Sequence, residues 1–198
     1  MTEADAKALL SAAGIAVPRN VHGAVLADLD LAGLTPPYAL KGLGFAHKTE
    51  AGAVRLGLAS LAGQTEMPGA AGYLVEEMVT GAVAEVLVGL RRDPVYGVSL
   101  TLGMGGVAAE LLADTVTLIL PVSSAEILEG LQRLRLWPLL DGYRGRPRAD
   151  VAALVEMVWQ LAALMAADTS LDEIEINPVL LRAQGAVAVD ALIRKVMP

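Results

Sequence analysis

Three oxygen-bearing side chains near the C-terminus, Glu175, Asn177 and Asp190, are spaced as a metal-binding group would be. Two apolar segments flank a turn-like cluster at residues 182–185, a pattern that predicts a β-hairpin. Glu175 and Asn177 are two apart and share one face of a strand, and the returning strand brings Asp190 opposite or diagonal to Asn177. Such a ligand set suits a hard cation such as Mg²⁺, which usually arrives with substrate phosphates. The alternative is an ordinary half-exposed hairpin whose polar residues face water.

A second candidate group lies around Lys41, at the end of a predicted strand. The loop that follows carries His47, Lys48 and Thr49 among several glycines. A cation, backbone N–H groups freed by glycine and a hydroxyl are what a phosphate site uses. The spacing is not that of a P-loop, and a solvated turn between two strands is the competing interpretation.

Two carboxylates are candidates for recognition of ribose hydroxyls. The apolar segments 73–79 and 85–91 are separated by a short turn, so we expect a tight pair of strands with Glu77 at one end and Glu85 at the other. In that arrangement both side chains could approach the same ligand. Taken alone, the two carboxylates are weak support for a binding site.

Composition excludes several classes of function. The chain has 198 residues, a net charge of −7 and no cysteine, so thiolate chemistry and disulfides are absent and a nucleic-acid surface is disfavoured. The acidic N-terminus lacks the features of a signal peptide. Glu156 and Gln160 interrupt the apolar segment 151–167, which favours a buried helix over a membrane span. We therefore expect a soluble, cytoplasmic protein with no nucleic-acid or membrane partner.

The remaining pattern predicts an α+β protein with two lobes. Aromatic residues make up only 4% of the chain, and Met157 and Trp159 on the long helix are expected in the core. The glycine- and proline-containing stretch 59–72 is the predicted linker between lobes. The expected helices are 2–13, 125–134 and 151–167, and the expected strands are 38–41, 54–58, 73–79, 85–91, 98–102 and 116–120, followed by the C-terminal hairpin.

Several segments, in this order, resemble the ATP-grasp domain of NDP-forming acyl-CoA synthetases. These enzymes are also called ADP-forming acetate–CoA ligases, and they are related to the β subunit of succinyl-CoA synthetase. The segments are Ala39-Leu40-Lys41, His47-Lys48-Thr49, Leu74-Val75-Glu76-Glu77-Met78-Val79, Arg91-Arg92-Asp93-Pro94-Val95-Tyr96-Gly97, Gly103-Met104-Gly105-Gly106, Asp141-Gly142-Tyr143-Arg144-Gly145, Glu175-Ile176-Asn177-Pro178 and Val187-Ala188-Val189-Asp190.

This resemblance implies an ATP-grasp fold, with a nucleotide cleft between an abbreviated N-terminal lobe at 1–75 and a C-terminal lobe at 76–198. Residues 1–19 would be able to pack on the second lobe. The resemblance also implies roles for individual residues. Lys41 would contact the phosphates, His47 would relay the phosphoryl group, and Lys48 and Thr49 would close over the nucleotide. The residues facing the base and ribose would be Glu77, Met78, Val79, Thr80 and Glu85. The Mg²⁺ ligands would be Asn177 and Asp190, with Glu175.

The implied reaction moves a phosphoryl group between ADP or ATP and a phosphohistidine on a CoA-binding α subunit. No α portion is present in this sequence, so we expect activity only with an α partner, in a homo- or hetero-oligomer. The loop between Lys41 and His47 is shorter than is usual in the family. For this reason a non-catalytic nucleotide-binding module is the main alternative, and an unrelated ATP-grasp carboxylate ligase is a third.

Overall fold

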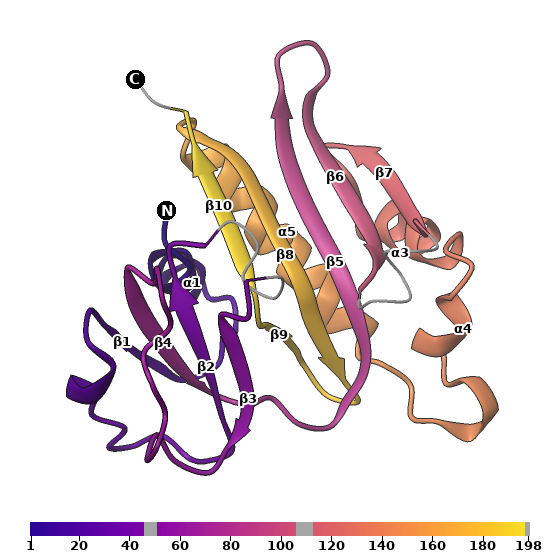
Figure 1. Ribbon diagram of the computed structural model, residues 1–198. Coiled ribbons are helices and arrows are strands. Elements are labelled where there is room, and N and C mark those ends of the chain that lie inside the picture. Colours follow the sequence, from indigo (N-terminus) through magenta and orange to yellow (C-terminus); the bar gives the residue numbers. More distant parts are fainter. Residues whose placement is uncertain (46–50, 106–112, 197–198) are drawn as a thin grey trace. The chain divides into compact units, whose positions relative to one another are not determined.

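The computed structural model describes residues 1–45, 51–105 and 113–196 (Figure 1). The chain divides into two compact units. One unit comprises Pro18–Thr80 with Thr2, and the other comprises Met1, Glu3–Val17 and Gly81–Pro198. The chain therefore passes from one unit to the other close to residues 17 and 80, and the division expected at residue 75 falls within a strand that ends at Glu77.

The unit formed by Pro18–Thr80 is built on a four-stranded antiparallel sheet in the order β1-β4-β2-β3. β2 is buried along its whole length because β4 and β3 flank it and apolar side chains cover it. The core of this unit includes Leu40, Tyr73 and Val75. Its elements are β1 (Asn20–Gly23), η1 (Leu26–Asp28), β2 (Tyr38–Leu43), β3 (Val54–Leu58) and β4 (Gly72–Glu77).

The stretch 59–72 is not a linker between lobes, so that expectation was wrong. It joins β3 to β4, two strands of the same sheet. The Met67 backbone N–H donates to the Tyr73 hydroxyl over 2.9 Å, and the Ala71 N–H donates to the Leu43 carbonyl over 2.8 Å. Glycine and proline thus mark a long internal connection here, and their local signal does not distinguish it from a linker.

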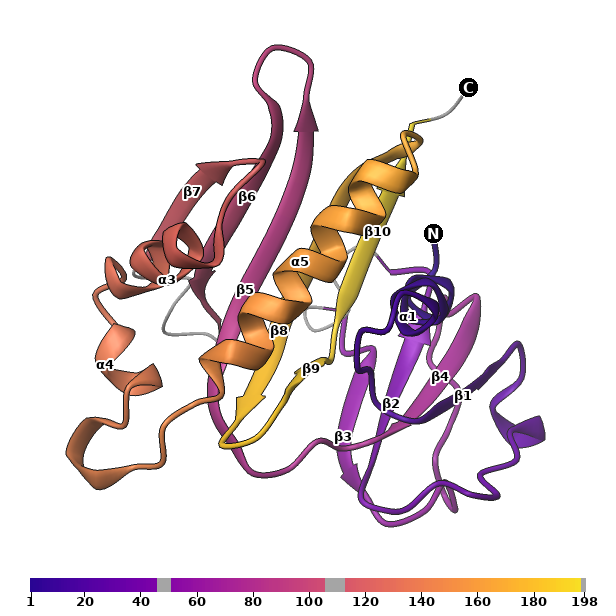
Figure 2. The ribbon, with the colours of Figure 1, turned by 180° about the vertical axis from the view of Figure 1, so that it is seen from behind.

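The other unit contains a larger antiparallel sheet, in the order β10-β8-β5-β6-β7, with β9 paired to β8. The helices cover one face of this sheet, as the view from behind shows (Figure 2). The elements are α1 (Glu3–Ala12), β5 (Ala82–Asp93), β6 (Gly97–Met104), β7 (Thr115–Ile119), α3 (Ser124–Gln132), α4 (Trp137–Leu140), η2 (Tyr143–Gly145), α5 (Val151–Ala167), β8 (Leu171–Arg182), β9 (Ala186–Ala188) and β10 (Ala191–Lys195).

The alternation of side chains along the strands builds the core of this unit. Val86, Val88 and Leu90 on β5 are fully buried in one cluster with Leu154 and Leu161 of α5. The intervening residues of β5 point to the opposite face of the sheet, which the helices do not cover. Alternation therefore separates an apolar face under the helices from a face that can carry polar groups.

Side-chain caps fix where the helices begin. Ser123 and Glu126 form a reciprocal capping box at the start of α3. The Asp150 carboxylate accepts from the Ala153 N–H at the start of α5 and from the Gly185 N–H in the turn after β8. These two N–H groups, Gly185 first, hold the pKa of Asp150 below its ordinary value. The cap thus ties the start of α5 to the C-terminal ribbon, which is β8 together with the paired strands β9 and β10.

α5 confirms the helix expected at 151–167, but its two large side chains differ in burial. Met157 is buried, as expected, whereas Trp159 is 46% exposed. Two positions along a helix correspond to a rotation of about 200°, so the two side chains lie on opposite faces. Among the described residues, no helix is long and apolar enough to cross a membrane.

Candidate functional site

The C-terminal ribbon brings Asn177 and Asp190 together, as the sequence predicted. The Asn177 backbone N–H donates to the Asp190 carbonyl over 3.1 Å, and the Val189 N–H donates to the Pro178 carbonyl over 3.1 Å. These two bonds pair Val189 and Asp190, which lie between β9 and β10, with the middle of β8. Both residues are partly exposed, so a ligand can reach them.

Glu175 lies two residues before Asn177 on β8, with Leu192 of β10 and Gly89 of β5 as its neighbours across the sheet. Burial raises the pKa of the Glu175 carboxyl, and the nearby carboxylates of Glu173 and Asp190 raise it further, against a lowering by Arg194. A partly desolvated carboxylate near a second one is an environment that a cation would stabilise.

The donor set of this ribbon is two carboxylates and one amide. Among the residues that the structure describes, no three His, Cys, Asp or Glu side chains form a group that could hold a metal ion. Glu175, Asn177 and Asp190 would supply only some of the oxygen ligands of a cation. Such a partial set suits Mg²⁺, because this ion keeps several waters and binds substrate phosphates.

Replacing Glu175 with Gln should raise the melting temperature of the ligand-free chain at pH 7. The unfolded carboxyl ionises at its ordinary pKa of 4.5, whereas the folded one has a raised pKa. The folded state therefore loses stability as pH rises from about 4.5 through that raised pKa, and glutamine escapes this loss. Thermal melts at pH 7 and at about pH 4 should show a gain that nearly disappears at the lower pH.

Glu173 offers a matched control for this experiment, because its carboxylate already has a cation partner. Its Oε2 lies 3.0 Å from Arg194 Nη1. Glu173→Gln loses the ion pair with Arg194 and relieves only the smaller, electrostatic part of the rise in the Glu175 pKa, so it should raise the melting temperature at pH 7 less than Glu175→Gln does. An equal gain in both variants would show that the effect does not come from desolvation of Glu175.

Lys41 lies on β2 and is buried against Glu76 on β4. Lys41 Nζ and Glu76 Oε1 are 2.6 Å apart, and their side chains are 5% and 1% exposed. Ala39 is the partner of Glu76 across the two strands, so Lys41, two residues along, shares its face. A lysine is rarely buried unless it is paired, and Glu76 therefore holds the ammonium group in place.

Glu77 and Met78 are tied to other parts of the same unit. The Glu77 carboxylate accepts from the Thr35 N–H over 2.7 Å, and Arg19 Nη1 lies 3.4 Å from it. The Met78 N–H donates to the Pro37 carbonyl over 2.9 Å, and its sulfur accepts from the Gly57 N–H over 2.9 Å. These contacts fix the path of the chain as it leaves β4. Val79 and Thr80 follow without a regular element.

Glu77 and Glu85 are not the two ends of a tight pair of strands, so that expectation was wrong. β4 pairs with β1 and β2, and β5 pairs with β6 and β8 in the other sheet. Both edges of β4 are already occupied, which leaves β5 no edge to pair with. Glu85 is exposed at the start of β5, and its carbonyl accepts from the Gly105 N–H over 2.7 Å.

Gly105 shows why glycine is needed in the segment 103–106. A Cβ built at Gly105 would lie 3.1 Å from the Glu85 carbonyl carbon and 3.1 Å from the Val86 nitrogen. Only glycine lets the two backbones approach this closely without a shift. The glycine therefore has a packing reason beside Glu85, independent of any contact with phosphate.

His47, Lys48 and Thr49 lie outside the residues that the structure describes. The described site residues thus form two groups. Glu175, Asn177 and Asp190 lie together on the ribbon, and Lys41, Glu76, Glu77 and Met78 lie on or beside β2 and β4. The sequence did not identify Glu76 as the partner of Lys41, because this ion pair can be recognised only once β2 and β4 are known to be neighbouring strands.

Comparison with known proteins gives consistent matches along the chain. A family model described as an ATP-grasp domain matches residues 1–194. The trans-feruloyl-CoA synthase FCS1, from an unidentified prokaryote, is 35% identical over 210 residues, which cover 96% of this chain and 30% of FCS1. The acetate–CoA ligase [ADP-forming] I subunit beta of Pyrococcus furiosus is 29% identical over 209 residues, covering 96% of this chain and 90% of that subunit.

A solved structure shares the fold over nearly the whole chain. It is the dinucleotide-forming acetyl-coenzyme A synthetase 1 of Ca. Korarchaeum cryptofilum, in complex with coenzyme A and Mg-AMPPCP. The TM-score is 0.83 at 26% identity, and the match covers 98% of this chain and 92% of that chain. Its phosphohistidine segment points towards the nucleotide binding site. The predicted α+β class and ATP-grasp fold are confirmed.

Proposed function

Since the chain belongs to the ATP-grasp domain family, we propose that it is the nucleotide-binding component of an ADP-forming acyl-CoA ligase. Pro18–Thr80 would form its N-terminal lobe, and the remainder its C-terminal lobe. The observation that carries the proposal is the pairing of Asn177 with Asp190 beside the partly desolvated Glu175. This is the donor chemistry that a Mg²⁺–nucleotide complex requires.

Mg²⁺ would be held by Asn177 and Asp190, with Glu175 nearby. When bound, this ion neutralises charge on the nucleotide phosphates. Burial, and then the carboxylates of Glu173 and Asp190, raise the Glu175 pKa, so a cation bound at the ribbon would stabilise the ionised form of Glu175. The coordination itself is supported by donor chemistry and by the presence of Mg-AMPPCP in the Korarchaeum relative.

Lys41 would contact the nucleotide phosphates as a fixed point charge. Glu76 orients its ammonium group, so little side-chain freedom is lost when a phosphate arrives. Lys48 and Thr49 would close over the phosphates, and His47 would relay the phosphoryl group. Glu77, Met78, Val79 and Thr80 would face the base and ribose, with Glu85 joining the ribose contacts.

The reaction we propose moves a phosphoryl group between nucleotide and a phosphohistidine on a CoA-binding α partner. Towards ATP, the P–N bond to the partner's histidine would break as a P–N bond to His47 forms, and that second P–N bond would break as a P–O bond to the terminal phosphate of ADP forms. The electron pair of each broken P–N bond returns to its imidazole. The chain spans about 30% of the length of FCS1 and about 90% of the length of a separately named beta subunit.

Two measurements test this function. In a thermal-shift titration, ADP or ATP with Mg²⁺ should stabilise the chain, by about 2.7 kcal/mol when nucleotide is at 100 times its Kd. Mg²⁺ alone and adenosine alone are the controls, and each should give a much smaller shift. Exchange of labelled phosphoryl between ATP and ADP should then appear when an α subunit is added.

The outcomes separate the alternatives. No stabilisation at millimolar Mg²⁺–nucleotide would contradict the nucleotide site itself. Stabilisation without exchange, even with an α subunit present, would instead identify a non-catalytic nucleotide-binding module.

A further inference from the structure

A cavity of about 480 Å³ opens beside α5, on the side of the larger sheet that the helices cover (Figure 2). The end of α5, the middle of α3, the start of β6 and the chain after β7 surround it. Its walls are almost wholly apolar and include Val98, Leu120, Ile127, Val158 and Ala162. Cavities of about 300–1,000 Å³ with such walls are typical of sites for small molecules. We call this space the α5 cavity.

The α5 cavity is separate from the groups on the C-terminal ribbon. Ile174 and Ile176 of β8 are buried in the core under the helices. Glu175 and Asn177 alternate with them along the strand and therefore point to the opposite face of the sheet. A ligand in the α5 cavity would not touch Glu175 or Asn177, so binding there does not depend on the function proposed above.

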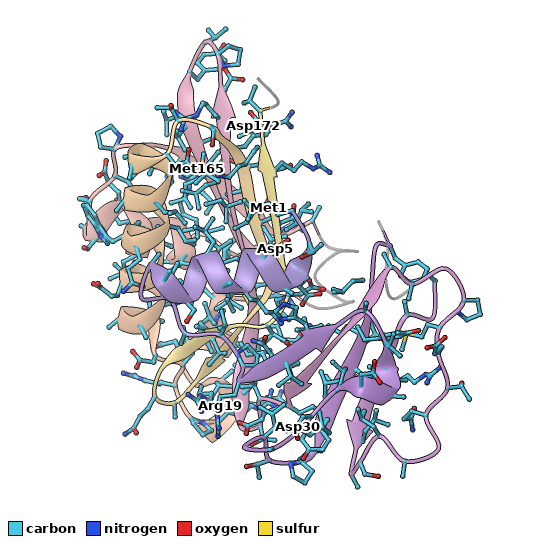
Figure 3. The ribbon with its side chains drawn as sticks, turned by 90° about the vertical axis from the view of Figure 1, so that its left-hand side faces the viewer. Met1, Asp5, Arg19, Asp30, Met165 and Asp172 are labelled. Carbon is cyan, nitrogen blue, oxygen red and sulfur yellow. The ribbon has the colours of Figure 1, made fainter. Side chains whose placement is uncertain are left out.

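Arg92 is the one charged residue among the described residues that line the α5 cavity. Its Nε donates to the Leu171 carbonyl over 3.2 Å, and its Nη2 donates to the Met165 carbonyl over 2.8 Å. Met165 lines the cavity as well, near the C-terminal end of α5 (Figure 3), where the negative end of the helix dipole favours a cation. The two bonds therefore fix the guanidinium at this end of the cavity.

The positive charge of Arg92 has no carboxylate to balance it within the part of the chain that the structure describes. The ion pairs between described residues do not include Arg92, although its side chain is partly buried. A guanidinium carries five N–H donors, and the bonds to the two carbonyls use two of them. Carbonyl groups are neutral dipoles, so they orient the guanidinium without cancelling its charge. A carboxylate would do so, because its two oxygens match the fork of the guanidinium.

Trp159 gives the cavity a rigid aromatic wall. Its Nε1 donates to the Ser124 hydroxyl at the start of α3 over 3.2 Å, which fixes the indole. The side chain is 46% exposed and lines the α5 cavity, so part of the ring is free to cover a ligand. Apolar surface that a ligand buries against such a wall contributes about 25 cal/mol per Å².

We propose that the α5 cavity binds an amphipathic monocarboxylate, which is a small acid with an alkyl or aryl body. The carboxylate accepts from the remaining N–H donors of Arg92, and the body lies against Trp159, Val98 and Ala162. A neutral apolar molecule would leave the charge of Arg92 unbalanced. A small anion without an apolar body would leave the walls in contact with water. Both parts of the ligand are therefore needed for tight binding.

A comparison of four small molecules tests this on the unaltered full chain by isothermal titration at pH 7. Octanoate and 1-octanol have chains of the same length, but only octanoate is charged. Acetate has the charge without the chain, and 3-phenylpropionate has an aryl body. We expect octanoate to bind at least tenfold more tightly than 1-octanol, and acetate to show no saturable binding. The ratio of the octanoate and 3-phenylpropionate affinities identifies the preferred body.

Substitutions on α5 and β5 place the binding in this cavity. Ala162→Phe puts a ring into the α5 cavity and should weaken octanoate binding at least tenfold. Ala152→Phe is the matched control, because Ala152 is exposed on the same helix and lines a different cavity, and it should bind within twofold of wild type. Arg92→Met should lower the affinity for octanoate to that for 1-octanol and leave the latter unchanged. Melting temperatures check that each variant is folded.

Equal affinity of the wild-type chain for octanoate and 1-octanol would overturn the proposal, because Arg92 would then play no part. This outcome can be observed even if Arg92→Met does not fold. Octanoate binding only at concentrations at which it forms micelles would also overturn the proposal. Unaltered binding by Ala162→Phe, or an equal loss in Ala152→Phe, would do the same, because the ligand would then lie outside the α5 cavity.

Discussion

Replacing Lys41 with Met should lower the affinity for Mg²⁺–ADP by at least about 100-fold, which corresponds to about 2.7 kcal/mol. The ammonium group is the one charge on β2, and Glu76 fixes its position from β4 over 2.6 Å. A charge-assisted contact with phosphate in such a desolvated place is worth more than at a surface. Isothermal titration with ADP measures this loss, and adenosine binding should be spared.

Lys41→Met should also lower the stability of the fold, and this effect has to be distinguished from the loss of nucleotide binding. Removing Lys41 leaves Glu76 buried without that partner, and breaking a buried pair in this way costs about 3–5 kcal/mol. The double variant Lys41→Met with Glu76→Gln should therefore recover most of the stability in denaturant melts. It should not recover ADP affinity. If affinity returned together with stability, Lys41 would be a structural residue only.

The second large effect is expected at the ribbon. Asp190→Asn should weaken Mg²⁺-dependent nucleotide binding by at least about 100-fold, because it replaces a charged carboxylate ligand with a neutral amide. Asn177→Ala should do the same, because it removes an amide oxygen ligand. The backbone bond between these two residues is available in both variants, and melting temperatures check that the fold is retained. Titration of nucleotide with and without Mg²⁺ measures the difference.

Asp172→Asn is the matched control for these variants. Asp172 is a partly exposed aspartate on the same strand, near its start, and Figure 3 marks its position. This change removes one negative charge from β8 without touching Asn177 or Asp190. Mg²⁺ dependence should stay at the wild-type level. A similar loss in Asp172→Asn would mean that general negative charge, rather than ligation, attracts the cation.

The ribbon could be predicted from the sequence because its geometry is local. A turn of few residues sets the register of a hairpin, and strand alternation then decides which side chains share a face. Asn177 and Asp190 are consequently neighbours in the structure, as their spacing implied. The Asp150 cap of α5 is local in the same way, because Asp150 directly precedes the helix and accepts from the Ala153 N–H.

Features that depend on distant strands could not be predicted in this way. Glu76 meets Lys41 only because β2 and β4 are adjacent, and the 30 residues or so between them carry no signal of that pairing. Thr80 and Gly81 look like the turn of a hairpin, yet β4 has no free edge for β5. Trp159 was expected in the core because of its size, whereas its position on the helix turns it outward.

The discontinuity of the unit built on the larger sheet has a consequence for biogenesis. Pro18–Thr80 is one uninterrupted stretch, so its sheet can assemble while the ribosome is still producing the rest. α1 precedes this stretch in the sequence but packs against β10, and the Met1 ammonium donates to the Ile193 carbonyl over 3.2 Å. α1 can therefore reach its packed position only after β10 has been synthesised. We expect loss of residues 191–196 to remove the strand on which α1 packs, so that this truncation would also destabilise α1.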